Sequence, residues 1–246
     1  MSKIKFFLIP ILLLSLSTFA NALSCEKNHC YYGNVGLGGA GYSFGGEDIK
    51  SYAGYLALEA RGVYYGRMQA VVGLRGGGGI SQAENVTNIA DKASLFIFEY
   101  YAKFGLNIAT ARTPLFINVF GERNGHQGAV SSKKGLDRDT IVLGAELEGN
   151  IPASDKLNLT YALGYAWVGY AHYTIGGQES KVDDYSYAIN ASVGFSKDIS
   201  QNMAYYTKLI GRYQNVAPAY IQGAQAYPHS DNYALMLEFG IKGFSK

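Results

Sequence analysis

Hydrophobic and polar residues alternate one by one along most of this chain after residue 31. In the clearest segment, residues 94–108, apolar side chains occupy the even positions, and Glu99, Tyr101 and Lys103 stand at odd ones. A period of two is that of a β-strand whose two faces meet different surroundings. A helix would scatter the same residues around its circumference. The segment therefore predicts a strand with one apolar face and one polar face.

The same alternation recurs in nine further segments, at about residues 31–44, 52–61, 68–75, 115–122, 140–150, 157–170, 185–196, 203–214 and 233–244. Short connections follow the even-numbered strands, at about 62–67, 110–114, 151–156 and 197–202. Longer connections follow most odd-numbered strands, at 76–92, 123–139, 171–184 and 215–232, with 45–51 as the exception. Alternating short turns and long loops are typical of a β-barrel that crosses an outer membrane.

Composition favours the same architecture. The chain has 31 glycines, 21 tyrosines and only 5 prolines, and 16% of its residues are charged. No apolar run after residue 22 reaches the length of about 18 residues that a spanning helix needs. Lipid offers backbone groups no hydrogen-bond partner, so a sheet in a membrane has to close on itself. We therefore predict an all-β fold, a closed antiparallel up-and-down transmembrane β-barrel over residues 31–246. It should have ten strands, or eight preceded by a folded N-terminal segment.

The N-terminus carries the pattern of a secretory signal peptide. Lys3 and Lys5 precede the apolar stretch 6–20, and Ala20-Asn21-Ala22 is a small-x-small cleavage site. We expect residues 1–22 to be removed, with cleavage after Ala22. Loss of the two lysines takes the formal net charge from +2 to zero. A neutral mature chain has no electrostatic footprint for nucleic acid.

A short segment, residues 23–30, is expected to precede the barrel on the periplasmic side. It holds both cysteines of the chain, Cys25 and Cys30. Export leads to an oxidising compartment, which favours a small disulfide loop between them. A lipidated Cys25 is the alternative. Two sulfurs alone do not complete a metal shell, and we expect no metal and no cofactor.

These features together resemble the small outer-membrane barrels of Gram-negative bacteria, the OmpA-like and opacity-like class. The resemblance is carried by the signal peptide, the two-residue alternation and the final segment Tyr233 to Phe244, although Ser245 and Lys246 follow the terminal aromatic residue. It implies a monomer in the cell outer membrane, inserted by the barrel-insertion machinery and surrounded by membrane lipid and lipopolysaccharide. It does not imply one activity, because fold and function separate readily.

The polar face of the strands predicts a charge network in the lumen. Strand parity turns six acidic and six basic residues inward: Glu59, Arg61, Arg75, Glu99, Lys103, Glu122, Glu146, Glu148, Lys208, Arg212, Glu238 and Lys242. Unpaired buried charges are costly, so a balanced set indicates salt bridges. A ten-stranded barrel is close in size to the eight-stranded barrels whose side chains fill the interior. We predict a filled lumen, with a narrow porin-like pore as the alternative.

Two patterns raise the question of an enzyme. Residues 36–41 match G-x-G-x-x-G, but no helix pattern follows, so a glycine-rich strand explains them better. Ten strands is also the count of the omptin proteases, whose sites combine an Asp pair with an Asp-His pair at the outer rim. The residues available for such a hydrolase are Asp183, Asp184, His229 and Asp231. Because the order is His-x-Asp rather than Asp-x-His, we expect no enzyme.

The long loops offer a different kind of function. Loop 123–139 is rich in charged residues, and loop 215–232 carries Tyr220 and Tyr227 among small polar residues. Tyrosine with small polar neighbours suits adhesive contacts. We therefore expect a structural or surface-interaction role, adhesin-like, with a host or extracellular ligand bound through the loops.

Overall fold

The computed structural model describes residues 25–26, 29–46, 48–83, 92–129, 136–154, 156–175, 177–182, 184–200 and 202–244. The expected signal peptide and its cleavage site lie outside these residues, as does Asp183. No helix in the described part of the chain is long and apolar enough to span a membrane.

Ten long antiparallel strands form the wall of a barrel. They are β2 (His29–Phe44), β3 (Ile49–Tyr64), β4 (Met68–Ala83), β5 (Lys92–Asn107), β6 (Leu115–Ala129), β7 (Leu136–Ser154), β8 (Leu157–Ile175), β10 (Tyr187–Ser200), β11 (Met203–Val216) and β14 (Ser230–Phe244). Four short strands are added at the two ends. They are β1 (Cys25–Glu26), β9 (Gln178–Val182), β12 (Ala219–Ile221) and β13 (Ala224–Tyr227).

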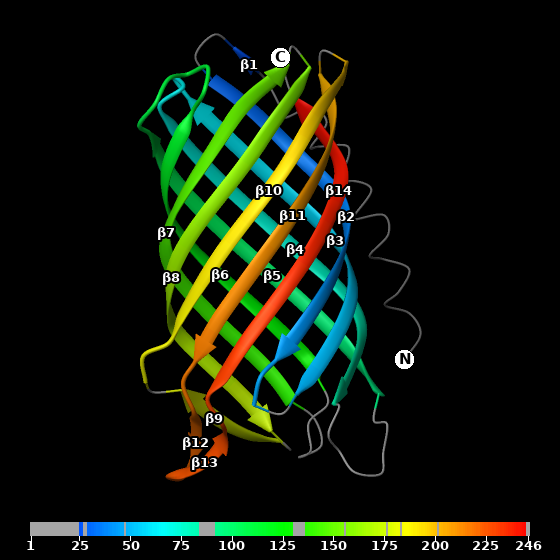
Figure 1. The fold of residues 1–246 in the computed structure, drawn as a ribbon, viewed down its shortest axis with the longest axis vertical. Coiled ribbons are helices and arrows are strands. Elements are labelled where there is room, and N and C mark those ends of the chain that lie inside the picture. The colour runs from blue at the N-terminus through cyan, green and yellow to red at the C-terminus, as the bar shows by residue number, and fades with distance from the viewer. Residues whose placement is uncertain are drawn as a thin grey trace, which may run out of the picture.

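The sheet closes into a ring. Strands β2 to β8 pair in sequence, β8 pairs with β10, and β10, β11 and β14 continue the wall until β14 pairs with β2. In Figure 1 the start of β2 and the end of β14 lie together at the top of the barrel. We call this the inner end. The opposite end, which carries β9, β12 and β13, is called the outer end.

The prediction of a closed antiparallel barrel of ten strands is confirmed, but its strand limits were too short. Strand β4 runs on to Ala83, so the glycines at 76–79 belong to the wall and not to a loop. Likewise β6 continues to Ala129, and β7 already begins at Leu136. Parts of the loops expected at 171–184 and 215–232 are also strands, namely β9, β12 and β13. The physical reason is that the two faces stop differing in polarity at the outer end. The outer half of β4 includes a run of glycines, and the outward positions of β6 and β7 there include Arg123 and Asp139, so the alternation on which the limits rested is lost.

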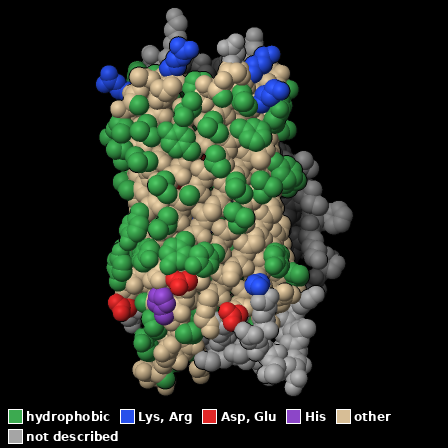
Figure 2. All heavy atoms as spheres, viewed as in Figure 1, with side chains coloured by type: hydrophobic (Ala, Val, Ile, Leu, Met, Phe, Trp, Pro, Cys, Tyr) green, Lys and Arg blue, Asp and Glu red, His purple; other side chains and the backbone are tan. Residues whose placement is uncertain are grey.

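The outer surface of the wall is apolar. The alternate outward positions hold large hydrophobic side chains about half exposed, such as Leu37, Phe104, Val119, Leu163 and Phe239. Figure 2 shows hydrophobic side chains over the visible wall, between Lys and Arg at the top and Asp, Glu and His lower down. Water would make such a surface unstable, whereas hydrocarbon matches it.

A chain of tyrosine rings crosses four neighbouring strands near the outer end. Tyr165 and Tyr187 have ring centroids 5.7 Å apart, Tyr187 and Tyr213 are 5.9 Å apart, and Tyr213 and Tyr233 are 5.2 Å apart. The Tyr213 hydroxyl donates to Asp231 at 2.7 Å. Tyrosines with an apolar body and a wet hydroxyl are typical of the boundary between lipid and water.

Candidate functional site

All twelve charged residues predicted for the lumen lie on the inner face of the wall. They come from seven of the ten long strands, and each strand turns every second side chain inward. The structure gathers most of them into two clusters, one above the other along the barrel axis.

The first cluster is built around two arginines. Arg75 on β4 pairs with Glu99 and, at 2.9 Å, with Glu238. Arg212 on β11 contacts Glu99 at 2.6 Å and Glu122 at 3.0 Å. The two guanidinium groups thus share the Glu99 carboxylate and connect strands on opposite sides of the ring. Because the Arg75, Glu99 and Glu238 side chains are each only 6–7% exposed, the bridges are shielded from water and act as struts across the lumen.

The second cluster lies closer to the inner end. Arg61 pairs with Glu148 and contacts Glu59 at 3.4 Å. Lys103 contacts both oxygens of Glu146, at 2.7 and 2.9 Å. The cluster thus joins three strands that are not all neighbours, namely β3, β5 and β7.

Neutral residues complete the hydrogen bonding of these carboxylates. The Gln69 amide donates to Asn118 at 2.7 Å, and Asn118 donates to Glu146 at 3.2 Å. The Tyr101 hydroxyl donates to Glu59 at 2.6 Å, and the Tyr206 hydroxyl donates to Glu238 at 2.8 Å. Satisfied acceptors offset the desolvation cost of a buried charge, so the network is stable only as a connected whole.

Two of the twelve residues differ from the rest. Lys242 lies over the ring of Tyr32, with its ammonium nitrogen 3.7 Å from the centroid. Lys208 forms no ion pair within 4.0 Å among the described residues. It lines two of the small cavities between the charged side chains, beside Lys103. The structure therefore does not join Lys208 to the salt-bridged network.

Apolar side chains fill the outer end of the lumen, which strand parity alone did not reveal. We call this group the outer plug; it comprises Phe44, Ile49, Leu95, Ile97, Leu136, Tyr173, Val216 and Tyr227. Each is at most 4% exposed. The Tyr173 and Tyr227 rings stack with centroids 4.7 Å apart, and the Tyr227 hydroxyl donates to the carbonyl oxygen of Gly45 at 3.0 Å. The hairpin of β12 and β13 is thereby fastened across the mouth.

A polar layer separates the outer plug from the charge clusters. It includes Arg138, which hydrogen-bonds to Gln214 and is 4% exposed, and His126, which is 5% exposed. The His126 ring lies edge-on to Tyr42 and Phe44, with centroids 4.5 and 4.9 Å away. Sequence reasoning placed both His126 and Arg138 in a loop. Their even numbers continue the inward parity of Glu122 and Glu146, so the signal was present in the chain.

Little free space remains inside the barrel. The cavities described in the lumen measure about 60, 40, 20 and 10 Å³. A site of that size holds one or a few water molecules. The Nδ1 and Nε2 atoms of His126 have no protein partner in the described structure, and they line the two smallest cavities. The lumen is therefore a packed interior at each of its levels.

The glycine motif at 36–41 lies within β2, as the interpretation of a glycine-rich strand requires. A Cβ atom at Gly36 would overlap the Tyr206 hydroxyl, and one at Gly38 would overlap the Tyr55 ring. These glycines leave room on the inner face for tyrosines that lie against them. Their role is in packing, with no phosphate-binding turn present.

The cysteines lie at the inner end, outside the ring. Cys25 and Cys30 are paired positions of β1 and β2, and Cys30 is disulfide-bonded. Cys25 is the only other cysteine in the chain. The pair therefore closes a small terminal hairpin that extends β2.

The residues considered for a rim hydrolase have other contacts here. The Asp184 carboxylate accepts from the backbone N–H of Tyr185 at 2.7 Å, and Asp231 accepts from Tyr213 and Asn215. No hydrogen bond among the described residues joins these aspartates to an imidazole. In the described ranges no group of three or more His, Cys, Asp or Glu could hold a metal ion.

Comparison with solved structures places this architecture among known folds. The outer membrane protease OmpT from Escherichia coli superposes with a TM-score of 0.62 at 11% identity, covering 87% of this chain and 96% of that chain. The chain has an outer-membrane β-barrel fold. The translocator domain of the autotransporter NalP from Neisseria meningitidis gives 0.46 at 10% identity, covering 97% and 95%. An outer membrane channel from Pseudomonas putida F1 gives 0.42 at 14% identity, covering 90% and 97%.

No protein-family model and no curated protein sequence matches the chain. The resemblance to small Gram-negative outer-membrane barrels is confirmed at the level of this fold, while the OmpA-like and opacity-like assignment stays a prediction. At these identities the likeness concerns the fold alone. A shared fold does not imply a shared function.

Proposed function

We propose that the protein is a non-conducting barrel of the bacterial outer membrane whose activity lies at its outer end. The observation that carries this proposal is the packed lumen. Two salt-bridged clusters occupy its middle and the outer plug fills its mouth, and the cavities between them measure about 60 Å³ or less. A hydrated ion would have to break several buried ion pairs to pass. The barrel is thus a rigid support rather than a channel.

The outer end supports a role in surface contact. Strands β7 and β8 extend beyond the charge clusters, and β9, β12 and β13 continue the sheet from the end of β8. We call β9, β12 and β13 the ledge. It exposes Tyr220, at 46%, together with the polar turn at Gln222 and Gly223. A tyrosine on a fixed support binds with a small loss of conformational entropy. The ledge is therefore the surface that we assign to an adhesin-like contact.

Single-channel recording tests the first half of the proposal. Purified mature protein, inserted in planar bilayers, should give no steady conductance. As a matched control, the variant Arg75→Ala/Arg212→Ala removes the two central struts and should open at least intermittently. A steady, porin-sized conductance of the wild type would overturn the closed barrel and favour the narrow pore.

Cell binding tests the second half. Cells that display the wild-type barrel should adhere to at least one of immobilised fibronectin, laminin and heparin better than cells with an empty vector. A variant in which residues 219–227 are replaced by a short Gly-Ser turn should lose that adhesion and still insert. Equal adhesion of all three strains would show that the ledge does not act in this way.

A further inference from the structure

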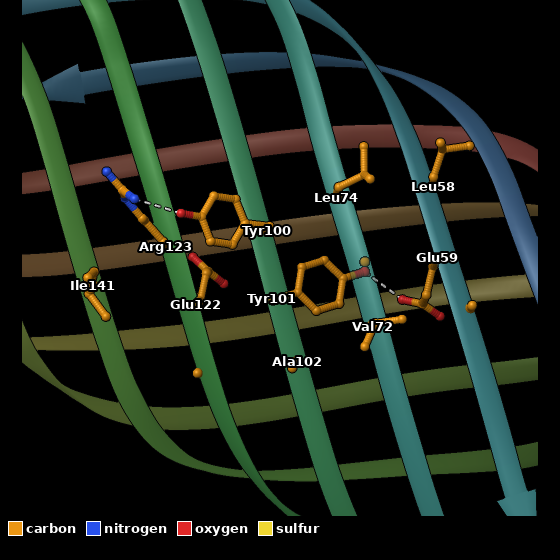
Figure 3. A pocket seen from close by; sticks show the side chains of 13 residues that line it. Leu58, Glu59, Val72, Leu74, Tyr100, Tyr101, Ala102, Glu122, Arg123 and Ile141 are labelled. Atoms are coloured by element: carbon orange, nitrogen blue, oxygen red, sulfur yellow. Dashed lines mark hydrogen bonds between the residues drawn. The ribbon is translucent and has the colours of Figure 1, made fainter. Parts of the chain in front are cut away.

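The outer surface of the barrel wall has a groove that is separate from the lumen. It encloses about 710 Å³ and crosses five neighbouring strands, from β3 to β7. Figure 3 shows the row of side chains along the edge of the groove that faces the outer end. Its members, each on the next strand, are Leu58, Leu74, Tyr100, Arg123 and Ile141. Adjacent members of this row are paired residues in the sheet. The groove is thus a continuous feature of the wall.

Small side chains form the floor of the groove. Ala60, Val72, Ala102 and Gly121 are successive paired positions on β3, β4, β5 and β6. Three of the four have at most one side-chain carbon. The next outward side chains toward the inner end of the barrel are Phe104 on β5 and Val119 on β6, which are 50% and 63% exposed. An apolar trough results, with larger side chains along its outer-end edge and, on β5 and β6, beyond its floor toward the inner end.

The trough has a direction. At one end, Leu58 lies in the inner half of β3, and at the other end Ile141 lies close to the start of β7 at the outer end of the barrel. Because strands in a barrel are tilted, a row across them climbs along the barrel axis. The trough therefore rises from the middle of the apolar wall toward its outer boundary, where Arg123 lies.

Arg123 is an outward-facing cation held in a fixed orientation. Its Nε contacts both oxygens of Asp139, at 2.9 and 3.0 Å, one terminal nitrogen also contacts Asp139, and the other donates to the Tyr100 hydroxyl at 2.8 Å. A guanidinium carries five N–H groups, and these contacts use three of them. The Arg123 side chain is still 40% exposed. It can therefore donate to a further oxyanion from outside the wall.

We propose that the groove holds an acyl chain of an anionic lipid, with the lipid phosphate bound by Arg123. The inference rests on the membrane residence in the proposed function but not on the closed lumen. An apolar trough leading to a guanidinium matches the two parts of such a lipid, and the two N–H groups that Asp139 and Tyr100 leave open suit the oxygens of a phosphate. A second copy of the chain would bring another apolar wall to the trough and leave the open donors of Arg123 without an acceptor.

Native mass spectrometry of the mature protein in non-ionic detergent tests this assignment. The probes are dioleoyl phosphatidylglycerol and dioleoylglycerol, which share their chains but differ in the phosphate. The wild type should retain the phosphatidylglycerol at least about tenfold better, which corresponds to about 1.4 kcal/mol. Arg123→Gln should bind the two lipids alike. Inorganic phosphate at the same concentration should not displace the lipid, because it lacks the chain.

A second pair of variants tests the trough itself. Ala102→Phe fills the floor and should reduce retention of both lipids, whereas Ala191→Phe makes the same change on the lipid-facing side of β10 and should leave retention unchanged. Each variant is checked for folding by its gel mobility without heating. The proposal is wrong if the wild type does not distinguish the two lipids, or if Ala102→Phe retains them like the wild type. A dimer peak that Ala102→Phe abolishes would assign the trough to a second copy instead. A conducting pore would overturn the proposed function and leave this result standing.

Discussion

At the scale of single residues, the lumen contains two kinds of buried cation. Arg75 bridges two carboxylates, while Lys208 has no ion pair within 4.0 Å in the described structure. The desolvation cost of a buried charge is repaid only where counter-charges and hydrogen bonds are in place. Two positions within one interior should therefore respond differently to the same kind of substitution.

Arg75→Met should destabilise the barrel by about 3–5 kcal/mol, because it leaves Glu99 and Glu238 without one of their partners. Lys208→Met should change the free energy of unfolding by less than about 1 kcal/mol, because no ion pair is lost. Urea titration of the protein folded into lipid vesicles measures both. A loss at Lys208 as large as that at Arg75 would mean that the carboxylates around its cavity stabilise Lys208 without a direct ion pair.

At the scale of strands, β4 shows how the sheet bends into a cylinder. Its glycines alternate between two environments. A Cβ atom at Gly77 or Gly79 would lie well under 3.0 Å from backbone atoms of β3, whereas one at Gly76 would meet nothing within 4 Å. Inward positions are crowded because curvature brings neighbouring backbones together on the concave side. Backbone atoms cannot move aside as a flexible side chain can.

Gly79→Ala should accordingly destabilise the barrel by about 1–3 kcal/mol through overpacking. Gly76→Ala is its matched control on the outward side and should be neutral or stabilise by about 0.4–1 kcal/mol, because alanine restricts the unfolded chain. The same urea titration compares the two variants. Equal effects at both glycines would argue against crowding as the reason for glycine on the inner side.

The alternation of residues predicted ten strands, and it predicted that the twelve lumen charges face inward. Both features follow from local sequence, because each side chain only has to suit the surroundings on its own side of the wall, either lipid or the barrel interior. The limits of the strands were harder. Leu95 and Ile97 are apolar yet face inward, so at the outer end both faces of β5 hold hydrophobic residues and the period of two disappears. The stacking of Tyr227 on Tyr173 joins residues far apart in the chain and could not be predicted from local pattern.

The choice of partners within the lumen was also beyond the sequence. Parity places Glu99 inward but does not say that it contacts Arg212 across the ring as well as Arg75 on the neighbouring strand. Such contacts depend on the diameter and stagger of the barrel, which are properties of the closed sheet. The groove beside Arg123 is likewise a product of register, because its floor aligns Ala60, Ala102 and Gly121 with Val72 across four strands.

At the scale of the whole molecule, the ring and the terminal hairpin are separate structures. The hairpin pairs only Cys25 with Cys30 and Glu26 with His29, whereas every long strand has a partner on both sides. The disulfide therefore should not contribute to the closure of the barrel.

We accordingly expect the unheated protein to migrate faster than the boiled protein on an SDS gel, since a closed barrel resists the detergent. Cys25→Ser/Cys30→Ser should show the same heat-dependent shift as the wild type. The measurement is the fraction of folded band against temperature, with and without reductant. Migration of the unheated double variant at the boiled position would show that the hairpin is needed for closure.

The pairing of β2 with β14 has a consequence for how the chain reaches its native state. These two strands close the ring, and they are the first and the last of the ten long strands to be synthesised. In the closed ring, Tyr32 lies opposite Phe244. Any shorter nascent chain keeps two unsatisfied sheet edges, which hydrocarbon does not tolerate. The barrel therefore cannot close before β14 is available. A protein that lacks only β14 should be degraded by periplasmic proteases and should not form a smaller barrel.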